Sequence, residues 1–109
     1  MHWIYAHLIG DYLLQNDWMA KNKKTSSFVC LAHIVTYILP FTFCGFSWLQ
    51  LFVIALQHFV QDRTSLVKWF LENTGKSEFA SPPMAPWSII IVDNIFHILT
   101  IATVASLKF

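Results

Sequence analysis

Four long apolar segments, separated by short polar linkers, constrain the fold of this chain more than any other feature. We expect helices over residues 1–18, 27–46, 48–71 and 87–107. All but the first reach the roughly 20 residues with which a helix crosses a bilayer. Only 12% of the 109 residues are charged and 56% are hydrophobic, which is too little polar surface for a soluble domain. The sequence therefore predicts one all-α domain over residues 1–109, a polytopic membrane protein built as a four-transmembrane-helix bundle.

The basic residues of the linkers predict an orientation. The linker after the first segment and the region around the end of the third carry Lys21, Lys23, Lys24, Lys68 and Lys76. By the positive-inside rule both regions are cytoplasmic, so both termini lie outside the cytoplasm. A net charge of +1 without a basic face argues against nucleic acid as a partner. Membrane lipids are the expected partners, and association into homo-oligomers stays open.

Ionisable residues inside the apolar segments are the feature that bears on function. His7 and Asp11, His58 and Asp62, and Asp93 and His97 are each four positions apart, and His33 stands alone in the second segment. Residues four apart share a helix face, so each pair projects to one side of its helix. Counted from the linkers, the seven residues lie at similar depths and can form one layer. An aspartate near the bilayer centre costs on the order of 3 kcal/mol on insertion scales, so several together require compensation.

A metal centre supplies such compensation, and we predict that all seven of these residues are its ligands. Mixed imidazole and carboxylate ligands suit zinc, manganese or iron. Seven ligands are enough for one or two divalent ions per chain, held as in bundles that project carboxylates and histidines inward. Two alternatives stay open. One is a polar network that fixes helix packing. The other is haem with His33 and either His58 or His97 as axial ligands, which leaves the three aspartates unexplained.

Two further residues are predicted to bind substrate. Gln15 continues the face of His7 and Asp11 by one helical turn, and Arg63 follows Asp62 with a guanidinium that suits a phosphate group. An alternative stays open for each residue. Gln15 is equally consistent with a solvated interfacial position, and Arg63 with a side chain that extends to the membrane surface.

The stretch from His7 to Lys23, His-Leu-Ile-Gly-Asp-Tyr-Leu-Leu-Gln-Asn-Asp-Trp-Met-Ala-Lys-Asn-Lys, resembles the opening of a known family. This family consists of small bacterial and phage integral membrane proteins and is called domain of unknown function 3307. Its later landmarks are similar too: the lone His33, the His-x-x-x-Asp of the third segment and the Asp-x-x-x-His of the fourth. The resemblance covers nearly the whole chain and implies a multi-pass protein of the bacterial inner membrane. The pattern is also loosely similar to small membrane-bound proteins labelled metal-dependent hydrolases, which favours hydrolysis.

The leading functional hypothesis is a membrane-embedded, metal-dependent hydrolase that acts on a lipid or lipid-linked substrate at the cytoplasmic leaflet. A metal pair would activate water and stabilise charge on a phosphoester or similar group. Asp11, Asp62 and Asp93 are the predicted catalytic residues, with a general base among them. One alternative is a non-enzymatic membrane protein whose structural metal or polar His/Asp cluster binds a partner or perturbs the membrane. The other is ion or proton transport.

Overall fold

The computed structural model describes residues 1–107, and this part of the chain is helical, without strands. In chain order the elements are α1 (Trp3–Leu8), the π-helix η1 (Ile9–Leu13), α2 (Asp17–Asn22), α3 (Ser27–Phe41), α4 (Trp48–Arg63), α5 (Leu66–Asn73) and α6 (Trp87–Ser106). The expectation of an all-helical chain is thus confirmed for the described residues.

Polar side chains set the starts of three helices. Asn16, Ser26 and Ser47 precede α2, α3 and α4, and each side chain accepts a hydrogen bond from the backbone N–H three residues later. Ser47 also forms a reciprocal capping box with Gln50. Such caps satisfy backbone donors that have no partner inside the helix.

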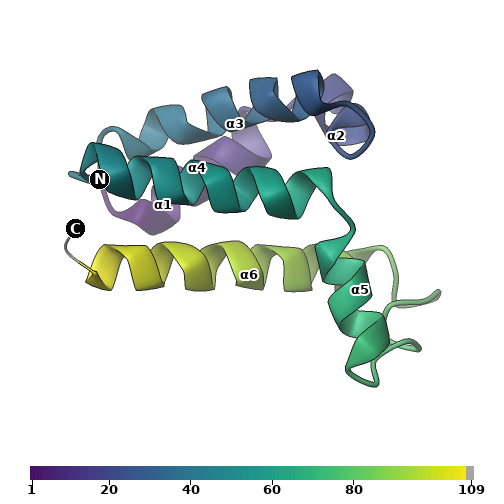
Figure 1. The fold of residues 1–109 in the computed structure, drawn as a ribbon. Coiled ribbons are helices and arrows are strands. Elements are labelled where there is room, and N and C mark those ends of the chain that lie inside the picture. Colours follow the sequence, from purple (N-terminus) through teal and green to yellow (C-terminus); the bar gives the residue numbers. More distant parts are fainter. Residues whose placement is uncertain (108–109) are drawn as a thin grey trace.

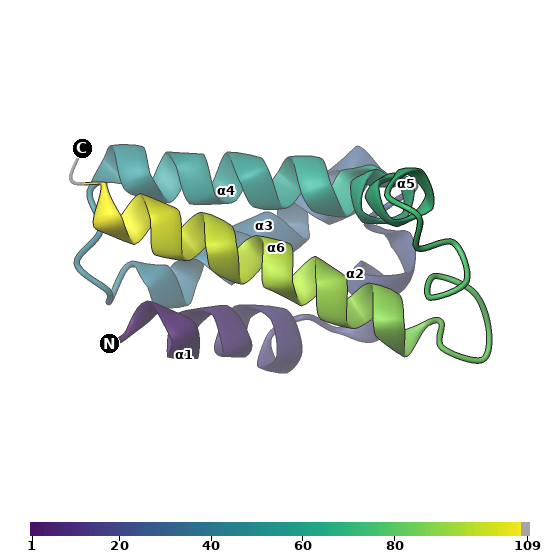
Figure 2. The same cartoon turned by 90° about the horizontal axis from the view of Figure 1, so that it is seen from below.

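Four helical stretches form the body of the molecule. α1, α3, α4 and α6 lie lengthwise beside one another, and α5 turns away at the end where α2 lies (Figures 1 and 2). At the opposite end, the ammonium group of Met1 donates to the carbonyl oxygen of Phe43. The apolar core between these helices consists of Ala6, Tyr37, Phe41, Leu51, Ile54, Ile101 and Val104. A smaller core of Val67, Leu71 and Ala80 packs α5 and the following loop against α6.

The prediction of four transmembrane helices is wrong. Within residues 1–107, α6 is the one helix that is long and apolar enough to cross a membrane, with 20 residues. α3 is apolar but has only 15 residues. The multi-pass topology and the predicted placement of both termini therefore have no support in the structure.

The apolar segments of the sequence do not become equally long helices because local stops divide them. The first segment becomes α1, η1 and α2, and the cap at Asn16 starts the last of these. The second segment was expected to be helical to residue 46, but α3 ends at Phe41, one residue after Pro40. The third segment is divided at Thr64, whose extended backbone separates α4 from α5.

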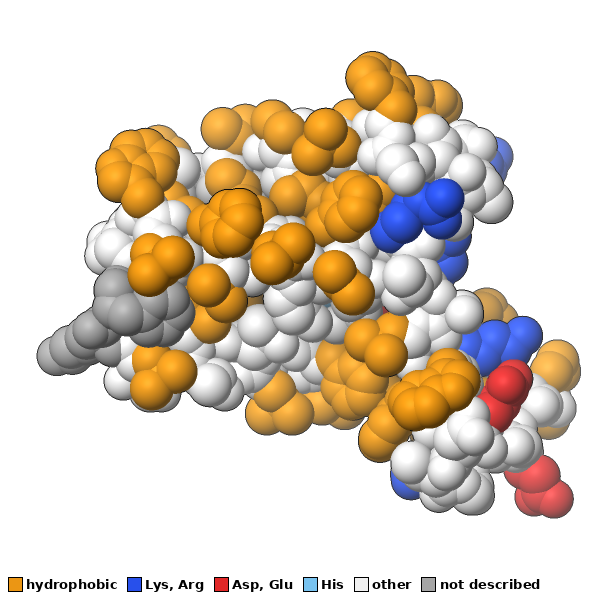
Figure 3. Space-filling model, viewed as in Figure 1, with side chains coloured by type: hydrophobic (Ala, Val, Ile, Leu, Met, Phe, Trp, Pro, Cys, Tyr) orange, Lys and Arg blue, Asp and Glu red, His pale blue; other side chains and the backbone are white. Residues whose placement is uncertain are grey.

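The outer faces of the long helices nevertheless carry apolar side chains in helical register. Exposed at intervals of three or four residues are Phe28, Leu31, Val35 and Leu39 on α3, Leu49, Phe52, Leu56 and Val60 on α4, and Ile91, Ile95 and Leu99 on α6. Figure 3 shows hydrophobic side chains spread over the face formed by α3 and α4, with Lys and Arg side chains gathered at the end near α2 and α5. Contiguous exposed apolar surface of this kind marks contact with a membrane or another protein.

Gly10 allows the π-helix to lie directly against α3. A Cβ atom at this position would lie 2.6 Å from Cδ1 of Tyr37, 3.0 Å from the Tyr37 carbonyl oxygen and 3.1 Å from the Tyr37 Cα. The last two atoms belong to the backbone of α3 and cannot rotate away. The close approach brings the next residue, Asp11, into the interior of the bundle. π-helical turns of this kind occur frequently at functional sites.

Replacing Gly10 by Ala is expected to destabilise the fold by about 1–3 kcal/mol, because the added methyl group overpacks the contact with α3. The sign is informative, since Gly to Ala in an unhindered helix is stabilising. Unfolding in a non-ionic detergent measures the change. The matched control is Leu13→Ala on the same π-helix, where the side chain is 76% exposed. A Gly10→Ala variant as stable as the parent would contradict the close packing of η1 on α3.

Candidate metal centre

A polar cluster lies inside the bundle, beside the apolar core. The structure brings all seven predicted ligand residues into it, and the side chain most accessible to solvent is that of Asp93, at 26%. The local reason is helix geometry. On α4, His58 and Asp62 share one face because they are four residues apart, and on α6 Asp93 and His97 do so for the same reason. Five helical elements, α1, η1, α3, α4 and α6, thus each present carboxylate or imidazole groups to one volume.

Four of the ligand atoms converge on one point. Nε2 of His33 lies 3.2 Å from both Asp11 Oδ1 and Asp62 Oδ2. Nε2 of His58 lies 3.3 Å and 3.0 Å from the same two oxygens, and the two nitrogens are 3.1 Å apart. These distances are five of the six edges of a tetrahedron. A tetrahedral ion with bonds of about 2.0–2.1 Å holds its ligand atoms roughly 3.3 Å apart. We refer to Asp11, His33, His58 and Asp62 as the tetrahedral group.

The hydrogen bonding within the tetrahedral group also favours a cation. Among the described residues, Asp11 Oδ1 is buried and has no hydrogen-bond partner, although two imidazole nitrogens lie within 3.3 Å of it. A buried carboxylate oxygen without a partner is costly, and nearly all such atoms in proteins are satisfied. The four atoms therefore have a spacing that could hold a shared ion.

A second set of possible ligands adjoins the first. Asp11, Asp93 and His97 each offer one ligand atom, and these atoms lie within 4.8 Å of one another. Nε2 of His97 lies 3.5 Å from Asp93 Oδ2 and 3.2 Å from Asp62 Oδ1. Asp11 and Asp62 therefore reach both groups, as carboxylates do between paired metals in helical bundles. We refer to Asp11, Asp93 and His97 as the open group.

Aromatic packing orients the imidazole rings. The ring of His58 lies between those of Tyr37 and His97, with both pairs of ring centroids 3.8 Å apart. In the described part of the chain, Nδ1 of His33 and Nδ1 of His58 have no hydrogen-bond partner, so stacking and the polar contacts of Nε2 position the His58 ring. The 3.1 Å between the Nε2 atoms of His33 and His58 leaves no space for a porphyrin between them, which argues against a haem with these two histidines as its axial ligands.

His7 lies at the edge of the cluster. Its Nδ1 is 2.8 Å from the hydroxyl of Tyr37, and its Nε2 is in close contact with Oδ1 of Asn94. The same Nε2 is 4.0 Å from Asp11 Oδ2, farther than the contacts of the other histidines. With both ring nitrogens engaged by Tyr37 and Asn94, His7 is placed to position Asp11 rather than to complete either ligand group.

Gln61 belongs to the cluster but was not predicted from the sequence. It is fully buried, and its Nε2 donates to Oδ1 and to the carbonyl oxygen of Asp93 at 2.7 Å and 2.8 Å. Its Oε1 accepts a hydrogen bond from Gln57. Gln61 therefore holds Asp93 in place. Helical spacing could have placed Gln61 in the cluster, because it is three residues after His58 and shares its helix face.

Lys23 also belongs to the site, although the sequence interpretation assigned it to a linker. Its Nζ donates to Asp62 Oδ2 at 2.9 Å and to Gln15 Oε1 at 2.9 Å, and its side chain is only 15% exposed. Burial lowers the pKa of this amine, but the facing carboxylate of Asp62 outweighs burial and leaves the pKa raised. Lys23 is therefore a permanent positive charge beside the tetrahedral group.

The two predicted substrate-binding residues support the site from outside. Gln15 accepts the hydrogen bond from Lys23 and lies against the backbone oxygen of Asp11. Arg63 donates to Ser27 Oγ and to the carbonyl oxygen of Lys24. Neither side chain lines the pocket described next, and a direct role of either residue in substrate binding stays a prediction.

A pocket of about 320 Å³ leads from the surface to the cluster. It lies where the linker between α2 and α3 meets the end of α4, α5 and the start of α6, and it is lined by Lys23, Lys24, Asp62, Ser65, Val67, Lys68, Ile89, Ile90 and Asp93. One carboxylate of each ligand group, Asp62 and Asp93, thus forms part of its wall. We call this space the lysine pocket.

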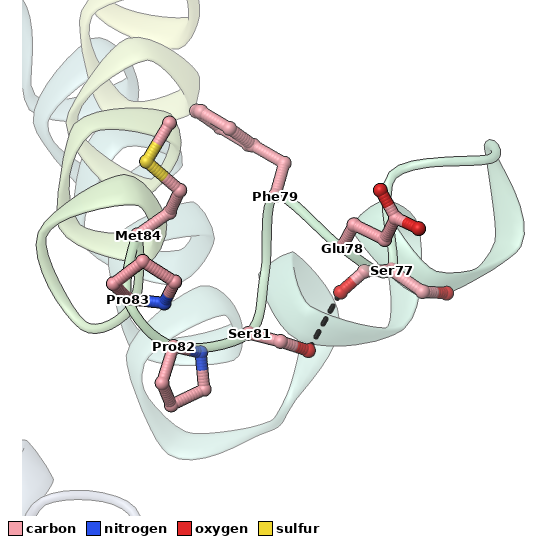
Figure 4. Close-up of a pocket in the computed structure, with 7 residues that line it drawn as sticks. All are labelled: Ser77, Glu78, Phe79, Ser81, Pro82, Pro83 and Met84. Carbon is pink, nitrogen blue, oxygen red and sulfur yellow. Dashed lines mark hydrogen bonds between the residues drawn. The ribbon is translucent and has the colours of Figure 1, made fainter.

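A larger hollow of about 640 Å³ lies elsewhere, on the loop between α5 and α6 (Figure 4). Its lining includes Glu78 and Phe79, together with two prolines and Met84. It contains no histidine and no carboxylate of the cluster, so its size does not indicate the chemical site.

The whole chain, residues 1–109, matches the family described as Protein of unknown function (DUF3307). The chain belongs to this family. The resemblance carried by His7–Lys23 and the later His/Asp spacings is thereby confirmed. No curated protein and no solved structure matches the chain. Since the DUF3307 description carries no activity, the function of this DUF3307 protein has to be inferred from the cluster and the lysine pocket.

Proposed function

We propose that this protein is a membrane-associated, metal-dependent hydrolase that acts on a lipid or lipid-linked phosphoester. The tetrahedral group carries the proposal, because four imidazole and carboxylate atoms have the spacing of ligands around a single ion. Zinc, manganese and iron all suit this mixture of ligands. The open group has three protein ligand atoms, which is the number that leaves a position for water or substrate in catalytic sites.

The charges of the cluster support metal binding. Three carboxylates, Asp11, Asp62 and Asp93, face one lysine, Lys23, which leaves two uncompensated negative charges when the histidines are neutral. One divalent ion neutralises them, and two ions make the cluster positive. A buried group of like charges is costly without such compensation. A cluster with two ions attracts an anionic substrate such as a phosphoester.

The arrangement suits hydrolysis of a phosphoester at the wall of the lysine pocket. A divalent metal at the open group would activate water and stabilise charge on the phosphoryl oxygens. The hydroxyl of water adds to phosphorus, the ester P–O bond breaks, and the remaining proton of water leaves with the alcohol. Gln61 holds Asp93 toward the reacting groups through its hydrogen bond at 2.7 Å. Lys23 keeps Asp62 ionised and in place.

Membrane association is supported by surface and helix composition. α6 is long and apolar enough to cross a membrane. The exposed apolar stripes on α3, α4 and α6 suit contact with lipid better than contact with water. Because the lysine pocket includes Ile89 and Ile90 at the start of α6, a substrate with an acyl or isoprenoid chain has an apolar route to the site.

Ion or proton transport is the less favoured alternative, because among the described residues the lysine pocket adjoins the cluster on one side and the apolar core on the other. Beyond it, Tyr37, Phe41 and Ile54 are fully or almost fully buried and fill the interior of the bundle. A transport path needs polar or hydrated groups on both sides of the ionisable residues. The apolar core therefore favours a site that is reached and left by the same opening.

The test is elemental analysis combined with a phosphodiesterase assay on protein purified without chelator. We expect one to two transition-metal ions per chain. Asp93→Asn is expected to lower turnover at least about 100-fold, the range seen when a group in direct contact with the reaction is lost, while the ion of the tetrahedral group stays bound. Glu78→Gln, in the hollow of Figure 4, is the control and should leave activity unchanged. Protein without metal would overturn the proposal and favour a polar network.

A further inference from the structure

We infer that the lysine pocket binds the phosphate group of an amphiphilic molecule, with Lys68 as the residue that anchors it. The inference deepens the proposed function, on which it rests, by naming the pocket and the residue that bind the phosphate of the substrate. Phosphate binding is nevertheless a property of the pocket that can be measured without catalysis.

The lysines of the pocket have hydrogen-bond donors to spare. An ammonium group has three donors. Nζ of Lys23 uses two of them on Gln15 and Asp62, and Nζ of Lys24 uses two on the carbonyl oxygens of Asp62 and Thr64. Each therefore keeps one donor.

Lys68 differs from the other two lysines. Among the described residues, it forms no hydrogen bond and no ion pair, and it is exposed on the first turn of α5 while lining the pocket. All three of its donors are available to a ligand. Ser65, just before α5, also lines the pocket, and its side chain makes no cap hydrogen bond with the helix. The pocket thus presents several unused donors around one opening.

The negative charges in the wall of the pocket are already engaged. Asp62 is paired with Lys23 at 2.9 Å, and Asp93 accepts a hydrogen bond from Gln61 but keeps its charge. The wall of the pocket holds three lysines, Lys23, Lys24 and Lys68, against the two carboxylates, so an anion there meets an excess of positive charge together with unused lysine donors. A phosphate group, which has several acceptor oxygens, matches such a set of donors better than a single acceptor does. Because Asp62 and Asp93 also belong to the ligand groups, a phosphate bound here lies next to the candidate metal centre.

The remaining wall is apolar and continues to the outside of the molecule. Val67, Ile89 and Ile90 line the pocket, and Ile90 is 52% exposed. Ile91 and Ile95 follow on α6 as part of its exposed apolar surface. A hydrocarbon chain attached to the phosphate can therefore leave the pocket beside the exposed isoleucines of α6, which is the reason for choosing an amphiphile over free phosphate.

The experiment is a binding titration with octylphosphonate, which cannot be hydrolysed as an ester, in a non-ionic detergent. Methylphosphonate measures binding of the head group alone, and octanol measures binding of the hydrocarbon chain alone. Lys68→Gln is compared with Lys76→Gln, whose ammonium lies over the Phe70 ring and outside the pocket. We expect octylphosphonate to bind at least about 10-fold more tightly than either fragment, and Lys68→Gln alone to weaken it about 5–10-fold, as for loss of a charge-assisted hydrogen bond.

The outcomes separate this inference from the proposed function. Equal binding to Lys68→Gln and the parent protein, or equal binding of octanol and octylphosphonate, overturns the phosphate site. Equal binding of methylphosphonate and octylphosphonate overturns the amphiphile and leaves free phosphate as the ligand. Lys68-dependent binding to protein that contains no metal and hydrolyses nothing would support the site while contradicting the hydrolase. Metal-dependent hydrolysis that is insensitive to Lys68→Gln would do the reverse.

Discussion

Replacing Asp62 by Asn is expected to remove both hydrolytic activity and most bound metal while the helical bundle stays folded. Asp62 contributes one oxygen to the tetrahedral group, and its other oxygen lies 3.2 Å from His97. Asn keeps the shape and one acceptor but loses the charge that the tetrahedral group needs. Loss of a residue that only supports a ligand costs about 10–100-fold in metal affinity, so loss of a ligand itself should cost at least about 100-fold. Metal titration and the phosphodiesterase assay measure the two losses.

The control for this variant is Asp17→Asn, which neutralises an exposed carboxylate at the start of α2. It should change neither metal content nor activity. Asp11→Asn should behave like Asp62→Asn, because Asp11 is a member of the tetrahedral group as well as of the open group. If the cluster were only a structural polar network, the neutral substitution would be tolerated or stabilising, since it removes a buried charge. A stable Asp62→Asn protein with full activity would therefore rule out the hydrolase.

Removing the metal is expected to lower the stability of the fold strongly. An ion present at 1,000 times its dissociation constant stabilises the native state by about 4 kcal/mol, provided that it does not bind the unfolded chain. Its removal also leaves the carboxylates of Asp11 and Asp62 facing the same volume with only Lys23 to compensate them. For a chain of about this length, each kcal/mol corresponds to roughly 4–8 °C in melting temperature, so a shift of more than about 10 °C is expected. Thermal unfolding in detergent with and without a strong chelator measures it.

A double variant, His33→Gln with His58→Gln, provides the control for metal removal. It lacks both imidazoles of the tetrahedral group, so the chelator should lower its melting temperature much less than that of the parent protein. If the parent protein loses its metal by elemental analysis and still melts at the same temperature, the ion contributes nothing to stability. Hydrogen bonds and the Lys23–Asp62 pair would then hold the cluster together.

The identity of the clustered residues could be predicted because it depends on short-range helix geometry. The spacing of four between His58 and Asp62, and between Asp93 and His97, places each pair on one helix face whatever the surrounding fold is. Apolar neighbours on all sides then require that this face points inward. The predicted seven residues consequently include every member of the two ligand groups.

The helix lengths could not be predicted in the same way. The first apolar segment reads as a single helix, yet it is divided at η1 and at the cap of Asn16. An apolar run reports what can be buried or lie in lipid, and it says little about where the backbone turns. For this reason the sequence predicted four helices able to cross a membrane, whereas residues 1–107 of the structure contain one.

By itself, the sequence determined that the described chain is helical and that its histidines and aspartates lie on shared helix faces, because both follow from interactions between residues three or four apart. Only the tertiary structure decided how these faces meet. Gly10 permits the contact that brings Asp11 to His33, and the turn before α3 carries Lys23 onto Asp62. The same packing directs Arg63 to Ser27 and away from the pocket, while Lys68 lines it. These contacts join residues far apart in the chain, and their geometry depends on how whole helices pack.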